Sequence, residues 1–249
     1  MIVIPLAGLS QRFFDEGFKV PKYMLLAKEK TIFYWSVKSF ERYFKDQHFL
    51  FICRDVYDTK SFIERSASEL GILNFEVIEL TGKTLGQAHT VQLGLSAADV
   101  FDEEPLIIFN IDTFRFRYKY PEFISNPLVS GYLECFKGSG LNWSNAVTEF
   151  DGSSRVIRTS EKQNESNLCC TGLYYFSTVN KFLDSYQSHY SAGNSDDNSE
   201  HYIAPIYNKL IAQGDEIMVD VIPKSSVIFC GTPSEYYELD GMPLDKFER

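Results

Sequence analysis

The chain begins MIVIPLAGLSQR (residues 1–12), an apolar run that leads into a short polar turn. The run reads as a buried β-strand, because strands that are covered on both faces are continuously apolar. Gly8 and Ser10 follow at once, and small residues there let backbone N–H groups approach a ligand. Two basic residues, Arg12 and Lys22, flank the next segment. The opening therefore predicts the first strand and turn of an open α/β sheet, with positive charge beside the turn. An ordinary tight turn followed by two exposed basic residues is the alternative.

The rest of the chain continues this alternation of apolar runs and stretches of helical spacing. Such a pattern predicts a mixed, mostly parallel sheet with helices on both faces. The predicted strands are 2–7, 48–53, 74–80 and 105–111, and the predicted helices between them are 31–44, 59–70 and 86–98. From residue 128 the sequence is strand-rich, with strands expected in GYLECF, NAVTEF, SRVIRTSEK and CCTGLYYFS and helices at 178–190 and 201–213. We expect a single domain over 1–249, with a nucleotide-binding half (1–127) and a substrate-binding half (128–249).

Composition excludes several classes of partner. The 249 residues are 44% hydrophobic, which is enough to bury a sizeable core. A formal net charge of −10 argues against nonspecific binding to nucleic acid or to an anionic membrane, so an anionic substrate needs a locally positive cleft. No apolar run reaches the roughly 18 residues that span a bilayer, and the N-terminus lacks the features of a secretory signal. We expect a cytoplasmic protein, and the sequence leaves open whether it forms a homo-oligomer.

Two further features carry less information about function. The five cysteines lie mostly in apolar runs without zinc-ligand spacing, so buried thiols are favoured over a disulfide or a zinc site. The segment SAGNSDDNSE (191–200) is polar and acidic and has little to bury, so we expect a mobile loop. A metal-binding role for its Asp196 and Asp197 is the weaker alternative.

Four blocks of the chain resemble the sugar-nucleotidyltransferase family, in order and in approximate spacing. Leu6-Ala7-Gly8-Leu9-Ser10-Gln11-Arg12, followed by Pro21-Lys22, is similar to the family signature L-A-G-x-[GS]-x-R…P-K. Leu85-Gly86-Gln87-Ala88 resembles the family's base-binding segment, and Asp112 in FNIDTF resembles its metal-binding strand end. Glu161-Lys162 resembles its acceptor-side pair, and the following Thr171-Gly172-Leu173-Tyr174-Tyr175-Phe176 resembles its T-G-x-Y-x-F strand. Short members of the family occur in bacterial capsule and surface-polysaccharide gene clusters.

This resemblance implies a Rossmann-like (GT-A-type) fold and a transferase that moves a nucleoside monophosphate from an NTP to a phosphorylated acceptor, with release of pyrophosphate. It implies Mg²⁺ as cofactor, held by Asp112, and a catalytic pair, Arg12 and Lys22, facing the phosphates. The implied nucleotide-binding residues are Leu6, Ala7, Gly8, Ser10, Gln87 and Asn110, and the implied acceptor-binding residues are Glu161, Lys162 and Gly172. The sequence shows no adenine-specific feature, which favours a pyrimidine NTP; the acceptor is a sugar phosphate or a smaller phosphorylated alcohol or acid.

One block departs from the family pattern. The late stretch SVIFCGTP has Phe229 where members usually carry a second metal-binding aspartate, two residues before Gly-Thr. Three alternatives are open for the second ligand: Asp220 in the strand-like run EIMVDV, the substrate itself, or none, with the metal held by Asp112 and phosphates alone. Asp220 is equally consistent with a surface residue on an edge strand.

Two rival functions stay open at this point. A GT-A-type glycosyltransferase is one, because Asn110-Ile111-Asp112 resembles a degenerate D-x-D metal motif. A non-catalytic nucleotide-binding relative is the other, with Phe229 as its supporting feature. The pair Arg12 and Lys22 favours the NTP-using enzyme, since that charge serves a triphosphate and a leaving pyrophosphate.

Overall fold

The computed structural model describes residues 1–190 and 200–247. The expected loop, including Asp196 and Asp197, therefore lies outside the described residues except for its last position. The described chain divides into two compact units. The N-terminal unit comprises Ile2–Lys83, Phe109–Lys119 and the described residues of Ser225–Arg249; the central unit comprises Met1, Thr84–Ile108 and the described residues of Tyr120–Lys224.

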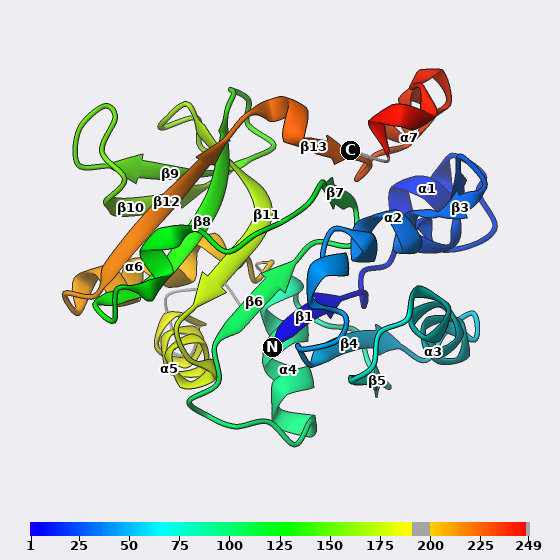
Figure 1. Ribbon diagram of the computed structural model, residues 1–249, viewed down its shortest axis with the longest axis horizontal. Helices are drawn as coiled ribbons and strands as arrows, with labels where there is room; N and C mark the ends of the chain where they lie inside the picture. Colours follow the sequence, from blue (N-terminus) through cyan, green and yellow to red (C-terminus); the bar gives the residue numbers. More distant parts are fainter. Residues whose placement is uncertain (191–199, 248–249) are drawn as a thin grey trace. The chain divides into compact units, whose positions relative to one another are not determined.

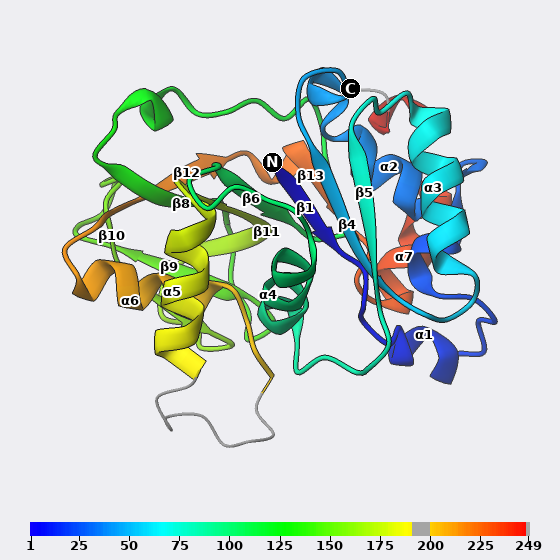
Figure 2. The same cartoon turned by 90° about the horizontal axis from the view of Figure 1, so that it is seen from below.

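Three parallel strands organise the N-terminal unit. They are β1 (Ile2–Pro5), β4 (Phe49–Arg54) and β5 (Phe75–Leu80), with β1 paired to β4 and β4 to β5. The first two consist almost entirely of buried apolar residues, as their uninterrupted hydrophobic runs require. Two helices, α2 (Ile32–Lys38) and α3 (Thr59–Leu70), contact each other and lie on the same face of these strands (Figure 2). The predictions of strands at 2–7, 48–53 and 74–80 and of a helix at 59–70 are confirmed.

The first predicted helix is shorter than its spacing suggests. It was expected over 31–44, whereas α2 ends at Lys38 and only a 3-10 helix, Glu41–Tyr43, follows. The cause is Ser39, whose Oγ accepts a bond from the N–H of Arg115 (2.8 Å) and whose carbonyl accepts one from the N–H of Tyr118 (3.3 Å). These tertiary bonds draw the backbone away from the regular helical path.

Shorter elements complete the N-terminal unit. They are α1 (Gln11–Asp15), a 3-10 helix (Lys22–Met24), β2 (Leu26–Ala27), β3 (Lys30–Thr31), β7 (Thr113–Arg115), β13 (Val227–Phe229), α7 (Pro233–Gly241) and a 3-10 helix (Leu244–Lys246). β13 runs antiparallel to β7, so the last part of the chain joins the segment that follows residue 109. One apolar cluster, which includes Phe13, Trp35, Phe114, Ile228 and Leu239, packs these elements together.

The central unit is built on a strand-rich sheet. Its elements are α4 (Gln87–Ala97), β6 (Leu106–Phe109), a 3-10 helix (Glu122–Ser125), β8 (Val129–Lys137), β9 (Ser144–Thr148), β10 (Val156–Glu161), β11 (Leu168–Phe176), α5 (Val179–Tyr190), a 3-10 helix (Ala204–Ile206), α6 (Tyr207–Ala212) and β12 (Glu216–Ile222). β8 lies between antiparallel β11 and parallel β12, and β9 pairs with both β10 and β11. Helix α5 packs against α6 and β11, and α6 against β10 and β12 (Figure 1).

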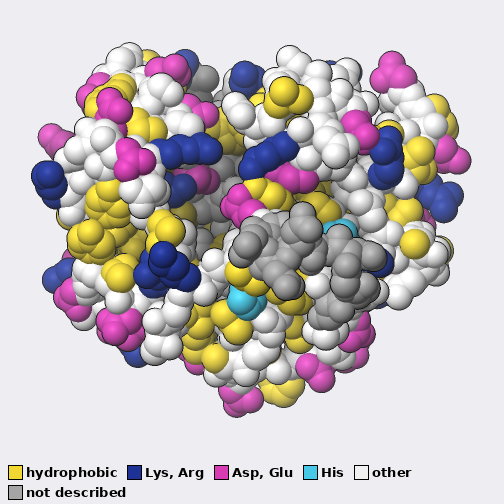
Figure 3. All heavy atoms as spheres, turned by 180° about the vertical axis from the view of Figure 1, so that it is seen from behind, with side chains coloured by type: hydrophobic (Ala, Val, Ile, Leu, Met, Phe, Trp, Pro, Cys, Tyr) yellow, Lys and Arg dark blue, Asp and Glu magenta, His cyan; other side chains and the backbone are white. Residues whose placement is uncertain are grey.

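The predicted fold class, mixed α/β with a strand-rich second half, is confirmed. In the central unit, the helix expected over 201–213 begins only at Tyr207, because a 3-10 turn containing Pro205 precedes it. All five cysteines are buried thiols, as predicted. No helix in residues 1–190 or 200–247 is long and apolar enough to cross a membrane. On the face drawn in Figure 3, the described Lys and Arg side chains are interspersed with Asp and Glu.

Candidate active site

The opening turn continues the backbone of β1. The N–H of Leu6 donates to the carbonyl of Ile52 (2.7 Å), which prolongs the ladder between β1 and β4, and Leu6 and Ala7 are buried. At Gly8 the direction in which a side chain would point is open, with no atom of the described chain within 4 Å of a Cβ placed there. The buried residues anchor the turn, and Gly8 keeps one side of its backbone accessible.

Ser10 joins the two parts of the first sequence block. It adopts a left-handed backbone conformation (φ 52°) just before α1, and its Oγ accepts a hydrogen bond from the N–H of Lys22 (3.1 Å). Lys22 opens the 3-10 helix Lys22–Met24 directly after Pro21. Arg12 lies on α1, is exposed, and forms no ion pair with any described residue. The turn therefore places Lys22 by a direct bond, whereas the guanidinium of Arg12 projects into solvent.

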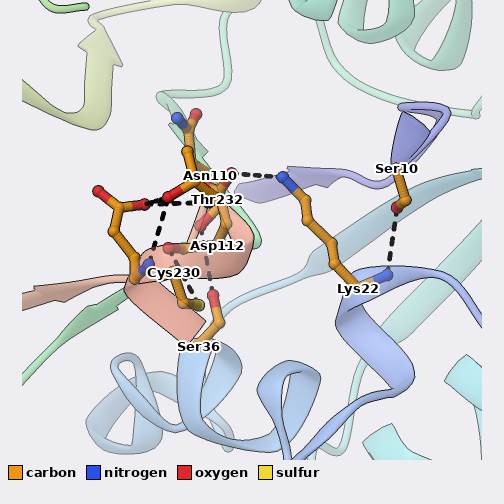
Figure 4. Close-up of polar contacts among 8 residues, drawn as sticks. Ser10, Lys22, Ser36, Asn110, Asp112, Cys230 and Thr232 are labelled. Atoms are coloured by element: carbon orange, nitrogen blue, oxygen red, sulfur yellow. Dashed lines mark hydrogen bonds and ion pairs between the residues drawn. The ribbon is translucent and has the colours of Figure 1, made fainter. Parts of the chain in front are cut away.

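Lys22 and Asp112 form an ion pair. The Nζ of Lys22 contacts Oδ2 of Asp112, and the two side chains are 20% and 21% exposed (Figure 4). The structure thus brings Lys22 and Asp112 together, two residues that were predicted from separate sequence blocks and are 90 residues apart. Because most of the surface of both side chains is shielded from water, this interaction is stronger than that of an exposed pair.

The backbone around Asp112 is held from two sides. Its carbonyl accepts bonds from the N–H of Cys230 (2.9 Å) and from the thiol of Cys230 (Sγ–O 3.3 Å), as Figure 4 shows. Burial raises the pKa of Cys230 well above its usual value, so the thiol keeps the proton that it donates. Two residues earlier, the carbonyl of Asn110 accepts a bond from Oγ of Ser36 (3.3 Å). The segment between β6 and β7 is therefore rigidly placed.

The residues at Asp112 fit a divalent cation. Carboxylate oxygens are the ligands that Mg²⁺ takes, usually one or two from the protein together with phosphates and water. Gly231 faces this carboxylate, and a Cβ at residue 231 would lie only 3.0 Å from Oδ2 of Asp112. Any larger residue would therefore fill the space in front of the carboxylate. Glycine leaves that space open for an ion.

The central unit holds the predicted base-binding segment. Gly86 precedes α4 and adopts φ 142°. A Cβ at residue 86 would lie 2.6 Å from the backbone nitrogen and 2.7 Å from the carbonyl oxygen of His201, which only glycine avoids. The same His201 donates to the carbonyl of Leu85 (2.7 Å) and accepts from the N–H of Ala88 (2.9 Å). The turn that carries Gln87 is thus bonded to the chain at residue 201.

The predicted acceptor-side pair lies at the end of β10. Oγ of Ser144 donates to the carboxylate of Glu161, and burial raises the pKa of Glu161 despite this bond and the nearby charge of Lys162. Lys162 contacts the hydroxyl of Tyr202, and its Nζ lies 3.7 Å from Oε2 of Glu200.

The short stretch 200–202 therefore contacts both the Gln87 turn and Lys162. This connection was not predicted from the sequence, because residue 201 was expected to lie inside a helix. The one sequence feature that relates to this connection is Gly86. Glycine is required there because the backbone of His201, which is distant in sequence, lies against it.

Two further predicted residues lie in the same unit. Gly172 (φ 94°) stands within β11, where the register with β8 shifts between Cys170 and Tyr174, so glycine serves a strand irregularity. Asp220 is on β12, opposite Glu134 of β8. Its role as a second metal ligand stays a prediction.

Comparison with known proteins identifies the family. No protein-family model matches the chain, and no curated protein matches it either. A nucleoside-diphosphate-sugar pyrophosphorylase from Vibrio cholerae RC9 is 46% identical, over 97% of this chain and 100% of that one, with a TM-score of 0.92. Two more distant structures share the fold. The inositol-1-phosphate CTP transferase from T. maritima is 15% identical, with a TM-score of 0.72 over 100% of this chain and 96% of that one. A UDP-glucose pyrophosphorylase from Acinetobacter baumanii is 13% identical, with a TM-score of 0.70 over 96% and 91%. The chain belongs to the nucleoside-diphosphate-sugar pyrophosphorylase family and is a nucleotidyltransferase.

Proposed function

We propose that this nucleotidyltransferase transfers a nucleoside monophosphate from a pyrimidine NTP to a phosphorylated sugar, or to another small phosphorylated acceptor, in the synthesis of bacterial capsule or surface polysaccharide. The observation that supports this reaction best is the shielded Lys22–Asp112 pair beside the opening turn. It offers an ammonium for phosphate oxygens and a carboxylate for a divalent cation at one place. The family relative, whose name refers to nucleoside-diphosphate sugars, supports the acceptor class.

The reaction needs little proton chemistry. An oxygen of the acceptor phosphate attacks the α-phosphorus of the NTP, a new P–O bond forms, and the bond from the α-phosphorus to the bridging oxygen breaks, releasing pyrophosphate. Both the nucleophile and the leaving group are anions at neutral pH, so no general base is required. The protein has to align two polyanions and neutralise their charge.

The chain's own residues divide these tasks in the proposal. The accessible backbone at Gly8 and the ammonium of Lys22 bind the phosphates of the NTP, and Arg12 supplies a second positive charge from α1. A bound Mg²⁺, held by Asp112, would neutralise phosphate charge. In the proposal, the Lys22 ammonium exchanges Asp112 for a phosphate oxygen of the NTP, and the carboxylate would then bind the divalent cation, so each side chain keeps a partner of opposite charge.

The acceptor side uses Glu161 and Lys162. Lys162 binds the acceptor phosphate, and Glu161 binds a hydroxyl or amine of the acceptor. The contacts that Lys162 makes with Tyr202 and Glu200 show that its ammonium can be bound by oxygen atoms. Its side chain is half exposed, which leaves it accessible to a phosphate.

Pyrophosphate release is the measurement that tests this proposal. The full chain is incubated with each NTP and a panel of phosphorylated acceptors in the presence of Mg²⁺. We expect release that requires both substrates, and its loss in Asp112→Asn, which keeps the side-chain shape but removes the charge that holds the ion. Release of a nucleoside diphosphate from a nucleotide sugar would instead support a glycosyltransferase. Full activity in Asp112→Asn with an unchanged Mg²⁺ requirement would refute the metal assignment.

A further inference from the structure

We propose that Glu235 supplies the second carboxylate of the metal site, in place of the aspartate that Phe229 replaces. This assignment concerns the same site as the proposed function and rests on it. Its basis is the position of Gly231. A Cβ placed there would lie 3.0 Å from Oδ2 of Asp112 and 3.7 Å from Oε2 of Glu235. Two carboxylate oxygens therefore lie within 4 Å of one point, and glycine leaves that point empty of side chain.

The local fold explains how these two carboxylates meet. β13 ends at Phe229, beside Thr113 of β7, and the next residue bonds the carbonyl of Asp112 through both its N–H and its thiol. The chain then turns at Gly231 into α7, and Glu235 lies in the first turn of that helix. The backbone bonds at residue 230 thus set the start of α7 against Asp112.

Glu235 also has a structural task, which does not require its charge. Its Oε2 accepts bonds from the N–H and Oγ1 of Thr232 (3.0 and 3.1 Å), and the N–H of Glu235 donates to Oγ1 of Thr232 (3.3 Å). This is a capping box, in which glutamine serves as well as glutamate. The helix dipole favours a carboxylate in the first turn. Beyond the cap, Oε2 of Glu235 lies near the same point as Oδ2 of Asp112, and a divalent cation near both oxygens would offset the repulsion between the two like charges.

A cationic side chain already contacts one of these carboxylates. Lys22 contacts Oδ2 of Asp112, the same oxygen that faces Gly231. A single ammonium balances one carboxylate charge, and a divalent ion at this place would balance both. Mg²⁺ commonly uses one or two carboxylates, with phosphates and waters as its remaining ligands. Asp112 and Glu235 match this donor set.

The test measures metal binding without reference to turnover. Mn²⁺ alone is titrated into the full chain, and the free ion is quantified by electron paramagnetic resonance. We expect one saturable site in the wild type, loss of that site in Asp112→Asn, and a Kd raised by about tenfold or more in Glu235→Gln, the scale for losing a ligand-sphere group. Glutamine keeps the capping box, so the melting temperature of Glu235→Gln should stay close to that of the wild type.

Two matched variants separate ligation from other effects. Glu238→Gln makes the same charge change at an exposed position of α7 and should alter the Kd by less than about twofold, because exposed charges are screened. Thr232→Val removes the cap hydroxyl but keeps the carboxylate, so it should lower stability and leave most of the Mn²⁺ affinity. A loss of affinity in Thr232→Val equal to that in Glu235→Gln would overturn the assignment, since the cap alone would explain it.

The outcomes also separate this inference from the proposed function. A protein that releases pyrophosphate but whose Glu235→Gln variant binds Mn²⁺ like the wild type keeps the function and loses the Glu235 assignment. A protein that binds Mn²⁺ through both carboxylates but releases no pyrophosphate from any NTP keeps the assignment and loses the function. Absence of saturable Mn²⁺ binding in the wild type overturns the assignment directly.

Discussion

Replacing Lys22 by alanine should have opposite effects on metal binding and on turnover. In the structure the Lys22 ammonium contacts the Asp112 oxygen that a metal would take, and both side chains are about four-fifths shielded from water. A divalent ion therefore has to displace this ammonium. Lys22→Ala removes the competitor, so Mn²⁺ should bind more tightly, while the loss of the positive charge beside the NTP phosphates should slow the reaction.

The size of both effects follows from the burial of the pair. Two unit charges 4 Å apart interact with about 4 kcal/mol at an effective dielectric constant of about 20. Desolvation offsets part of this, and hydrogen bonds to charged groups contribute about 1.5 to 3 kcal/mol net. At about 1.4 kcal/mol per factor of ten, the Kd for Mn²⁺ should fall by about 10- to 100-fold. Turnover should fall by about 100-fold or more, the scale for losing one oriented charge at a developing phosphoryl anion.

Two assays on the same protein check these numbers. Electron paramagnetic resonance gives the Mn²⁺ Kd, and pyrophosphate release at saturating NTP gives turnover. Lys19→Ala is the matched control, because Lys19 is exposed and carries the same charge, and neither quantity should change by more than about twofold. An unchanged or weaker Mn²⁺ affinity in Lys22→Ala would show that the ammonium does not occupy Asp112 in solution. Near-normal turnover would remove Lys22 from the phosphate site.

Three further predictions concern the central unit. Lys162→Ala should raise the KM for the phosphorylated acceptor far more than the KM for the NTP; an equal rise in both would place Lys162 on the nucleotide side. Gly86→Ala should lower the free energy of unfolding by about 1 to 3 kcal/mol, because its Cβ would lie 2.6 Å from the His201 backbone and its φ would be strained. Gly82→Ala is the control: a Cβ there has no atom within 4 Å, so this variant should melt like the wild type. Burial raises the pKa of Glu161, so the folded protein binds this proton more tightly than the unfolded chain and loses stability as pH rises above the ordinary value of 4.5. Glu161→Gln should therefore melt above the wild type at neutral pH, and the difference should shrink below pH 4.5; a difference independent of pH would contradict this.

The hydrophobic pattern alone predicted the helices and strands whose local sequence and tertiary surroundings favour the same structure. β4 is apolar and buried up to its last residue, Arg54, and α3 has regular spacing and a glycine at its end, so local sequence and tertiary packing agree. α2 ended early because Ser39 bonds to a segment more than 70 residues away, which no local pattern records. β7 and β13 have three residues each, and such short strands have no periodicity to detect; they exist because they pair with each other.

The candidate site likewise contains residues that were predicted from the sequence and one, Glu235, that was not. Ser10, Lys22 and Asp112 were selected through a family resemblance, and the structure brings them into contact. Composition could not have paired Lys22 with Asp112 among 24 basic and 34 acidic residues. Glu235 was missed because its first-turn position reads as an ordinary helix cap. Only the approach of Gly231 to both carboxylates sets Glu235 apart.

The charges around Gly231 suggest why metal and nucleotide would bind together. The net charge near Gly231 is −1, because two carboxylates (Asp112 and Glu235) and one ammonium (Lys22) lie there. A negative charge repels a triphosphate. A divalent cation held by Asp112 and Glu235 would reverse the sign, and the Lys22 ammonium would then be available to bind a phosphate oxygen. Each ligand therefore improves the site for the other, and this coupling has to be reciprocal in free energy. A bound metal would in this way add to the positive charge that Lys22 and Arg12 supply, so that an acidic protein can bind a polyanion at this place.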